Sequence, residues 1–556
     1  MDAVVASPYG LGQAKKDKDF TEARALEEKL FPILCDLLNQ YHGTRHGSRF
    51  WKIILGHWFS RFIDVILNRV RTLEQCLQAY QLSGTSAFAD GCYSLATMDS
   101  ISAIWAFSND RWNNALYIRI LNLLEVTSCP VQVISDDLSE SFQWTAMASE
   151  VPPNKKILKW SIEKVKKLPE SFVRENDAFI INSYLPLKEE IKLQLALGQV
   201  PQLWRSPKLK FAKSVDRDLR RQLSNQIGGK SNETLYEILS TIVFELLPVC
   251  YLEGFTEISE TVKLLPWPKR PKFIFTSNNF DFDEIFKFWV AAKVESGFKY
   301  ITGQHGNNYG THRYLIHLTE ETTPDKFLTW GWEDGLPQHT PAFVFKIAGH
   351  TDKAYNPNGG LLLIELHAAQ MFSTWDDSAE FNSFFDDQQN FIGRLQKQIK
   401  KELIVRLHHG SKNLKWDEEA RWKDFDPCLK IDTGEEPIYK LTAQSRLVIH
   451  SYDSTGILET LSQNIPTLAF WQNGFDHLRD SAKPYYKMLV DAGIVHLTPE
   501  SAAAKVNSVW DNVDGWWAQS NVQETRKQFC NRYARVSQNP SRNLKNILKK
   551  CFNDVE

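Results

Sequence analysis

Three short segments of this sequence combine histidine, hydroxyl, amide and glycine residues in patterns that could support chemistry. The first reads GQHGNNYG at residues 303–310. Glycines allow the backbone to approach a ligand closely, and a histidine can act as a general base near neutral pH. We therefore expect His305 to face a ligand as a candidate catalytic base. The alternative is a structural turn in which His305 only hydrogen-bonds the backbone.

Other polar residues of the same region are candidates for contacts with a second substrate. Gln304, Asn307 and Tyr309 lie in the loop itself, and Arg313 follows it. These residues would follow the carboxyl end of a strand, where parallel sheets bind their ligands. We expect them on the acceptor side of a reaction.

The second segment, VRLHHG at residues 405–410, again follows a short apolar run. Arg406 offers a fixed positive charge and His408 a hydrogen-bond donor, and both suit phosphate oxygens. We expect both to bind a phosphate-bearing donor. The alternative is an ordinary salt bridge of Arg406 beside a surface pair of His408 and His409.

The third segment, HSYDSTGILETL at residues 450–461, runs from a strand through a hydroxyl-rich turn into a helix. Backbone N–H groups and the dipole at a helix start favour a phosphate group. The predicted donor-binding residues are Ser451, Ser454, Thr455, Gly456 and Glu459, the last placed to reach ribose hydroxyls. The alternative is a plain N-cap, in which a hydroxyl satisfies the helix start.

Two acidic residues, Glu333 and Asp334, compete with the histidine for the role of catalytic base or nucleophile. An exposed acidic turn is the alternative interpretation of this pair. No Asp-x-Asp motif lies in a suitable loop, and no cysteine or histidine cluster has zinc-ligand spacing. We expect neither a metal ion nor a cofactor.

Hydrophobic periodicity predicts the elements that must position these residues. Residues 20–80 and 205–265 have apolar positions at helical spacing, and residues 519–551 form a polar helical stretch. Short apolar runs alternate with helical stretches from residue 272 onward, which predicts parallel sheets covered by helices. The predicted strands are 131–134, 178–181, 273–276, 300–302, 327–329, 344–348, 361–364, 403–407, 428–431, 447–450, 467–470 and 494–497, and further helices are 283–295 and 379–400.

A chain of 556 residues is too long for one hydrophobic core. The turn-rich segment NPNGG at residues 356–360 is the strongest linker signal. The predicted fold is α/β, with two Rossmann-like domains whose parallel sheets face each other across a cleft. The predicted parts are a helical N-terminal region (1–125), a first Rossmann-like acceptor domain with a helical insertion (126–355), a second Rossmann-like donor domain (356–520) and C-terminal helices (521–556).

Composition excludes several classes of protein. The 65 Lys and Arg residues are balanced by 67 Asp and Glu residues, so no global positive field would attract nucleic acid. The eight cysteines are scattered, which argues against a disulfide scaffold and favours a reduced cytoplasm. Residues 51–67 are too polar to span a bilayer and predict a buried helix, with a membrane-surface helix as the alternative. We expect a cytoplasmic protein with at most peripheral contact at the inner face of the membrane.

The ordered set Gln-His-Gly, Arg-Leu-His and Ser-Tyr-Asp-Ser-Thr resembles polymer transferases of bacterial envelopes. CDP-glycerol glycerophosphotransferases of teichoic acid synthesis carry related motifs in this order. Capsule β-Kdo transferases and bacterial sialyltransferases carry related His-Pro and Ser-Ser/Thr motifs, which hold the CMP phosphate. With the segment TWGW at 329–332, the chain looks most like transferases associated with bacterial surface-glycan or flagellin-glycosylation genes. It departs from the related families at position 409, where His replaces Pro, and in the placement of the hydroxyl pair Ser454 and Thr455.

This resemblance implies a GT-B type glycosyltransferase. The donor would be a nucleotide-activated sugar, with CMP-linked Kdo or a nonulosonic acid implied by the resemblance alone. The acceptor would be a surface glycan, a lipid-linked glycan or a glycoprotein. Two alternatives stay open at this stage: a UDP-sugar 2-epimerase of the same fold, and a non-catalytic protein that binds a glycan or nucleotide.

Overall fold

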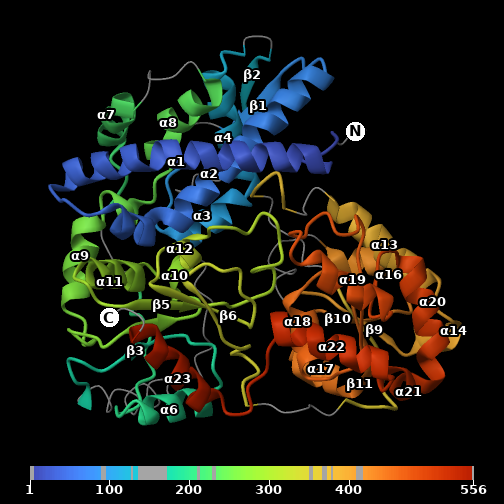
Figure 1. Cartoon of the computed structure of the whole chain (residues 1–556). Coiled ribbons are helices and arrows are strands. Elements are labelled where there is room, and N and C mark those ends of the chain that lie inside the picture. Colours follow the sequence, from blue (N-terminus) through green and yellow to red (C-terminus); the bar gives the residue numbers. More distant parts are fainter. Residues whose placement is uncertain are drawn as a thin grey trace, which may run out of the picture. The chain divides into compact units, whose positions relative to one another are not determined.

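The computed structural model describes residues 6–88, 95–126, 129–134, 172–209, 213–227, 233–349, 355–365, 372–376, 380–408 and 417–553. The chain divides into two compact units, whose elements are labelled in Figure 1. Unit 1 comprises residues 1–181, 202–300 and 370–379, and unit 2 comprises residues 182–201, 301–369 and 380–556. The four-part division expected from the sequence, with its boundary near residue 356, stays a prediction.

Helices predominate in unit 1, and α2 lies at their centre. Helices α1, α8 and α11 all pack against α2. The side chains of Trp51, Trp58 and Phe62 in α2 are almost completely buried, because this helix is apolar around most of its circumference. The buried-helix interpretation of residues 51–67 is therefore confirmed. The helices of unit 1 are α1 (Gln13–His42), α2 (Ser48–Ala79), α3 (Ser100–Phe107), α4 (Asp110–Leu123), α7 (Arg217–Ile227), α8 (Thr234–Leu246), the 3-10 helix η2 (Val249–Tyr251), α9 (Phe255–Lys263), α10 (Asn279–Phe282) and α11 (Glu284–Glu295).

Parallel strands occur in both units. In unit 1, β1 (Thr85–Phe88) pairs with β2 (Val131–Ile134), and β1 was not expected from the sequence. A five-stranded sheet has the order β3 (Phe179–Ile180), β4 (Ile274–Thr276), β5 (Tyr300–Gly303), β6 (Lys326–Thr329) and β7 (His339–Pro341). The pairs β3–β4, β5–β6 and β6–β7 are parallel.

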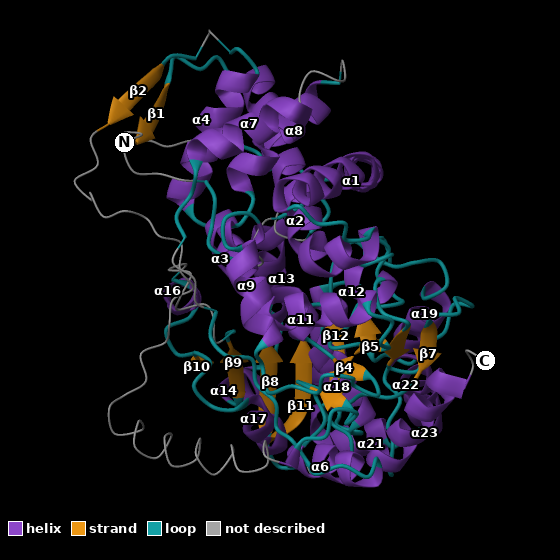
Figure 2. Ribbon diagram, turned by 90° about the vertical axis from the view of Figure 1, so that its left-hand side faces the viewer, coloured by secondary structure: helices purple, strands orange, loops and turns teal. Residues whose placement is uncertain are grey.

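Unit 2 holds a second parallel sheet, with six strands. Figure 2 shows β8 and β11 side by side at its centre. Its order is β10 (Lys430–Asp432), β9 (Leu403–Arg406), β8 (Gly360–Ile364), β11 (Ser445–His450), β12 (Thr467–Phe470) and β13 (Val495–His496). Every pair is parallel. Two parallel sheets and a helical N-terminal region confirm the predicted α/β class with two Rossmann-like sheets.

Helices surround the six-stranded sheet and close its hydrophobic core. Helices α13, α14 and α20 and helices α17, α18 and α22 lie around its strands (Figure 1). One large apolar cluster joins the strands to these helices and includes Trp330, Trp332 and Trp422. The helices of unit 2 are α6 (Leu187–Ala196), α12 (Thr319–Thr322), α13 (Phe381–Gly393), α14 (Lys397–Lys401), α16 (Glu418–Phe425), α17 (Ile438–Gln444), α18 (Thr455–Ser462), α19 (Lys483–Asp491), α20 (Pro499–Val509), the 3-10 helix η4 (Trp510–Asn512), α21 (Val513–Trp517), α22 (Ser520–Tyr533) and α23 (Pro540–Asn553).

Several predicted elements differ in the structure. Residues 344–348 are not a strand but a turn, in which Val344 donates its N–H to Arg535 O at 2.8 Å. The apolar side chains there are buried, and Val344 and Ile347 belong to the large apolar cluster of unit 2, so apolarity alone gave the wrong element. The predicted helix 379–400 is two helices, α13 and α14, and the helix predicted for 519–551 is also two, with Pro540 starting the second. The expected strand 428–431 lies slightly later, at β10.

The glycines of the segment 356–360 have a packing role. A Cβ atom on Gly359 would overlap the carbonyl of Gln444, and one on Gly360 would overlap the carbonyl of Glu402. Because these residues precede β11 and β9, the glycines let β8 begin close to both neighbouring strands. The turn signal in the sequence therefore marks the entry into a central strand.

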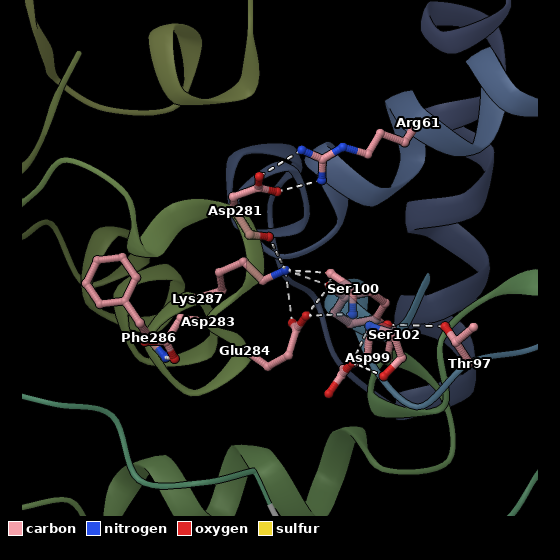
Figure 3. A network of polar contacts seen from close by, with 11 residues as sticks. Arg61, Thr97, Asp99, Ser100, Ser102, Asp281, Asp283, Glu284, Phe286 and Lys287 are labelled. Carbon is pink, nitrogen blue, oxygen red and sulfur yellow. Dashed lines mark hydrogen bonds and ion pairs between the residues drawn. The ribbon is translucent and has the colours of Figure 1, made fainter. Parts of the chain in front are cut away.

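A buried polar network joins five elements of unit 1 (Figure 3). The ammonium of Lys287, with no exposed side-chain surface, lies 3.0 Å from the Glu284 carboxylate and donates to Tyr251 Oη at 2.7 Å and to Ser100 Oγ at 2.9 Å. Tyr251 Oη in turn donates to Glu284 at 3.0 Å. Nearby, Asp281 receives two hydrogen bonds from Arg61 of α2, at 2.6 and 2.7 Å. Helices α2, α3, α10, α11 and η2 are thereby fixed together.

We predict that Lys287→Met destabilises the protein by about 3 to 5 kcal/mol, because it leaves the buried Glu284 charge without its partner. Urea unfolding measures this loss. The double variant E284Q/K287M should recover part of it. The matched control is K263M, which removes an exposed ion pair worth less than about 1 kcal/mol. A loss for K287M no larger than that of the control would contradict the role assigned to the network.

Candidate active site

The loop that follows β5 is organised by Gln304. This side chain is 1% exposed and donates from Nε2 to Gly306 O at 2.8 Å. Its Oε1 accepts from Trp330 N and from Trp332 Nε1, both at 2.8 Å. Gly310 follows with φ +70°, and a Cβ there would meet the Trp332 ring at 2.5 Å. The Gln304 amide therefore holds the loop on two buried tryptophans, and an acceptor contact by Gln304 stays a prediction.

His305 is hydrogen-bonded to a buried carboxylate through a tyrosine. Tyr309 Oη donates to Glu320 Oε1 at 2.6 Å, and His305 Nδ1 lies 3.1 Å from the same Tyr309 oxygen. Tyr309 and Glu320 are each 6% exposed, and Glu320 is placed by its carbonyl, which accepts from Thr302 Oγ1 of β5 at 2.7 Å. The single tyrosine proton is given to Glu320, so His305 Nδ1 must be the donor to Tyr309. Nε2 of His305 is then the basic nitrogen.

Asn307 connects this loop directly to the third predicted segment. Its N–H donates to Thr455 Oγ1 at 2.9 Å, and its side-chain Nδ2 donates to Asp453 Oδ1 at 2.8 Å. Both partners belong to unit 2, as does the His305 loop. The structure thus brings His305, Tyr309, Asn307 and Thr455 into one hydrogen-bonded neighbourhood.

Asp453 is the centre of this connection, although the sequence did not single it out as a site residue. Besides Asn307, it accepts from Tyr486 Oη at 2.8 Å and lies 3.2 Å from His477 Nε2. Its side chain is 8% exposed. Burial and the Asp453 carboxylate together raise the pKa of Tyr486 well above its usual value, so Tyr486 acts as a proton donor to Asp453. Three donors, one from the loop after β5 and two from residues 477–486, therefore meet on one carboxylate.

Helix α18 begins at the predicted phosphate-binding turn. Ser454 occupies the N-cap position but makes no capping hydrogen bond, and its Oγ lies 3.3 Å from His450 Nδ1 instead. Burial lowers the pKa of His450 to about 3, so this histidine is neutral at pH 7. A Cβ on Gly456 would lie 2.6 Å from the His450 ring. Gly456 therefore lets the helix start pack on His450, and the plain N-cap alternative does not describe Ser454.

Other predicted donor residues already have partners. Ser451 Oγ donates to Ile364 O of β8 at 3.1 Å. Glu459 pairs with Lys346 at 3.3 Å, and Lys346 also lies over the Tyr184 ring, which contacts His305 edge to face at 6.3 Å between centroids. Ser451 thus anchors the turn to β8. Glu459 is connected to His305 through contacts of Lys346 and Tyr184.

Arg406 and His408 lie at the end of β9. The Arg406 guanidinium pairs with Asp432 of β10 and donates to Glu436 O at 2.8 Å. His408 follows β9 and is half-buried, and His409 lies outside the described residues. The ion pair of the alternative interpretation is therefore present. Phosphate binding by Arg406 stays a prediction and would require it to leave or share Asp432.

Glu333 and Asp334 form an exposed turn between β6 and β7. Asp334 accepts from Leu336 N at 3.1 Å and from His339 Nδ1 at 2.9 Å. Glu333 is exposed, and its carbonyl accepts from Arg532 at 2.8 Å. The carboxylate joined to His305 is Glu320. Catalysis by Glu333 or Asp334 stays a prediction, with a geometry that matches an exposed acidic turn.

Arg313 lies in a segment clamped by another loop of the same unit. Its N–H donates to His477 O at 2.9 Å, and its side chain donates to Asp476 O at 3.3 Å. Arg479 donates to His312 O at 3.0 Å and to Leu315 O. Residues 312–315 are thus held by residues 476–479, which include the Asp453 partner His477.

The structure also shows a buried carboxyl group that sequence analysis missed. Glu365 directly follows the central strand β8 and is 2% exposed. Burial and the neighbouring Glu418 raise its pKa to about 8, against the opposing effects of Trp422 and Arg421. Glu365 is therefore mostly protonated at pH 7. The signal that could have found it is its place at the carboxyl end of a predicted strand in a parallel sheet.

Residues 2–548 match the family described as LIC12162 family transferase. This match shows that the chain is a transferase, which confirms the prediction of a transferase. The chain belongs to the LIC12162 family of transferases.

Several solved structures are similar to this chain, and three of them illustrate the likeness. The structure of S. aureus MnaA with UDP has a TM-score of 0.37 at 11% identity and covers 68% of this chain and 97% of its own. MurG of Acinetobacter baumannii has a TM-score of 0.32 at 11% identity, with coverage of 67% and 99%. A variant of the wall teichoic acid polymerase TagF has a TM-score of 0.32 at 12% identity, with coverage of 73% and 100%. A search of curated proteins found no matching relative.

Two further observations concern metals and membranes. Within the described ranges, no group of three or more His, Cys, Asp or Glu side chains is arranged to hold a metal ion. Among the helices that the structure describes, none is long and apolar enough to cross a membrane. Independence from metal ions and from cofactors stays a prediction.

We predict that Asp453→Asn destabilises unit 2 by about 2 kcal/mol, because an amide cannot accept from three donors at once and leaves buried donors unsatisfied. Urea unfolding followed by tryptophan fluorescence measures the loss. The control D480N changes a fully exposed aspartate and should leave the unfolding midpoint unchanged. Equal midpoints for D453N and the wild type would show that Asp453 does not hold the two loops together.

We predict that Glu365→Gln flattens the dependence of stability on pH. The folded-state pKa of Glu365 is raised, so stability is highest below about pH 4.5 and falls as pH rises towards 8. Glutamine does not titrate, so the stability of E365Q relative to the wild type should increase by about 3 to 4 kcal/mol between pH 5 and pH 8. Urea titrations across this range measure the slope. The exposed control E419Q should run parallel to the wild type, and a parallel line for E365Q would refute the assignment.

Proposed function

We propose that this transferase is a glycosyltransferase of the GT-B type, which moves a sugar from a nucleotide donor to a surface glycan, a lipid-linked glycan or a glycoprotein. The observation that carries the proposal is the hydrogen-bonded connection between the His305 loop and the start of α18. This connection sets a candidate base beside a candidate phosphate site.

The donor phosphate would bind at the N-terminus of α18. The first-turn N–H groups receive no capping bond from Ser454, and the helix dipole favours an anion there. Thr455 Oγ1 accepts from Asn307, so its own proton is available to donate to a phosphate oxygen. Glu459 would contact the ribose hydroxyls, and Arg406 and His408 would supply further contacts to the phosphate.

The acceptor hydroxyl would be deprotonated by His305. The oxygen of the acceptor hydroxyl attacks the anomeric carbon of the donor sugar. The bond from that carbon to the phosphate oxygen breaks, and the nucleotide leaves with the electron pair. His305 Nε2 takes the hydroxyl proton. The resulting imidazolium is stabilised by Glu320, which accepts from Tyr309 while Tyr309 accepts from His305 Nδ1. Gln304, Asn307, Tyr309 and Arg313 would line the acceptor side.

The finer identity of the donor follows only from the resemblance of the motifs, which favours a CMP-linked Kdo or nonulosonic acid. We propose a metal-independent reaction without a separate cofactor, because helix α18 and its hydroxyls supply the positive end for the leaving phosphate. We further propose that the protein acts in the cytoplasm, with peripheral contact at the inner face of the membrane.

The test begins with thermal shifts of the purified protein against CMP, CDP, UDP, GDP and ADP, with and without magnesium. A ligand that binds the native state raises the melting temperature. We expect a CMP-selective rise that is independent of magnesium and is lost in S454A/T455V. A UDP-selective rise without acceptor-dependent turnover would favour the epimerase instead, and no rise with any nucleotide would sink the donor site.

The second arm separates chemistry from binding. With the identified donor, His305→Ala should lower turnover by about 100-fold or more. Tyr309→Phe should lower kcat by about 10-fold, because the link from His305 to Glu320 is broken. Both variants should keep the nucleotide-induced thermal shift. Tyr485→Phe, a change outside this network, is the matched control. Unchanged turnover in H305A would remove His305 as the base, and binding without any turnover would favour a non-catalytic binding protein.

A further inference from the structure

Unit 1 contains a cavity of about 720 Å³ that none of the residues discussed above lines. Its walls come from β1 and β2, from one face of α4 and from the first turn of α7. On α4, the lining residues Arg111, Ala115, Ile118 and Asn122 recur every three to four positions and so share one face of the helix. Cavities of this size accommodate small molecules rather than a protein or nucleic-acid surface.

One wall of the cavity is apolar. It includes Phe88 of β1, Ile118 of α4, and Val131 and Val133 of β2. Strand β2 is exposed along its whole length, and Val133 is 64% exposed. Parallel two-stranded ribbons normally cover such residues, because apolar surface in water is unfavourable. The wall therefore offers apolar surface to a ligand.

The cavity also has a basic part. Five arginines line the cavity, and Glu245 is the one acidic residue among the lining side chains that the structure describes. Arg119 forms two hydrogen bonds with Glu245, at 2.6 and 2.9 Å, which neutralises that pair. The other four arginines are Arg111, Arg217, Arg220 and Arg221.

Arg220 builds the wall and is paired with Glu253, and Arg221 forms a solvent-exposed ion pair with Asp218 at 3.4 Å. Arg220 is 2% exposed and is fixed by Glu253 and by the carbonyls of Phe244 and Leu247 at 2.6 to 2.8 Å. Arg217 and Arg221, like Arg220, lie near the start of α7, and both are exposed. Arg111 reaches from α4 and lies over the Phe88 ring at 5.3 Å, at the junction of the basic and apolar walls.

We propose that this cavity binds one molecule of a phosphate-bearing amphiphile. Its phosphate would contact Arg111, Arg217 and Arg221, whose forked donors suit phosphate oxygens. Its apolar chain would lie along Phe88, Val131 and Val133. Charge complementarity and the adjoining apolar wall favour this ligand over a free anion or a neutral lipid. Identification of the ligand as a lipid-phosphate-linked acceptor rests on the proposed function, whereas the binding itself does not.

The test measures binding of alkyl phosphates to the full chain by isothermal titration calorimetry, below their micelle concentrations. Affinity should rise from hexyl to octyl to decyl phosphate by about 4-fold per buried methylene. Decyl maltoside, which lacks the charge, and inorganic phosphate, which lacks the chain, should bind at least about 10-fold more weakly than decyl phosphate. None of these measurements depends on turnover, so failure here is distinct from failure of the glycosyltransferase proposal.

Variants assign the binding to the cavity. R111Q/R217Q should weaken decyl phosphate binding by about 10-fold or more, and V133S should weaken it by about 3-fold through lost apolar contact. R174Q changes an exposed arginine outside the cavity and should bind like the wild type. V133S alters an exposed side chain, so it keeps the test valid if the double arginine variant fails to fold.

Three results would overturn the proposal. Equal affinity for inorganic phosphate and decyl phosphate would show a simple anion site. Binding to phosphatidylglycerol vesicles without binding to monomeric alkyl phosphates would show a membrane-docking surface. Unchanged affinity in both R111Q/R217Q and V133S would place the ligand elsewhere.

Discussion

The candidate active site depends on the carboxylate of Asp453. This one side chain receives hydrogen bonds from Asn307 and, about 170 residues later in the sequence, from His477 and Tyr486. A buried carboxylate that accepts several hydrogen bonds is stabilised only while all its donors stay in place. The loop after β5, the turn before α18 and residues 477–486 are therefore held together by this carboxylate.

This constraint gives His305 a defined chemical state. Asn307 is two residues from His305, so anchoring Asn307 on Asp453 and Thr455 also limits where the imidazole can lie. Tyr309, four residues after His305, sets the tautomer of His305 because it gives its own proton to Glu320. The loop needs Gly310 for the same reason, because the Trp332 ring occupies the space of a side chain. Position and protonation of one histidine thus follow from packing and hydrogen bonds of its neighbours.

Much of this arrangement could be predicted from the sequence, because it depends on local patterns. Short apolar runs predicted β4, β5, β6, β8, β9, β11 and β12 closely, and polar residues after such runs predicted the loops that matter. The partners could not be predicted. Glu320, His477 and Tyr486 carry no local signal, since only the fold brings them to Tyr309 and Asp453. The turn at 344–348 was also missed, because buried apolar residues in a loop have the same pattern as a strand.

Because the fold alone sets the partners of a side chain, residues with the same kind of charge have different roles here. Asp453 has three donors and fixes two loops, whereas the Glu365 carboxyl is buried beside Glu418 and its pKa rises to about 8. Arg406, predicted to bind phosphate, is paired with Asp432, and Arg220 is fully used in holding α7. A buried charged residue that already has a close ionic partner must therefore leave or share that partner before it can bind a ligand. By that criterion, the start of α18 is a stronger candidate phosphate site than the end of β9, because Ser454 is turned towards His450 and leaves the helix dipole uncapped.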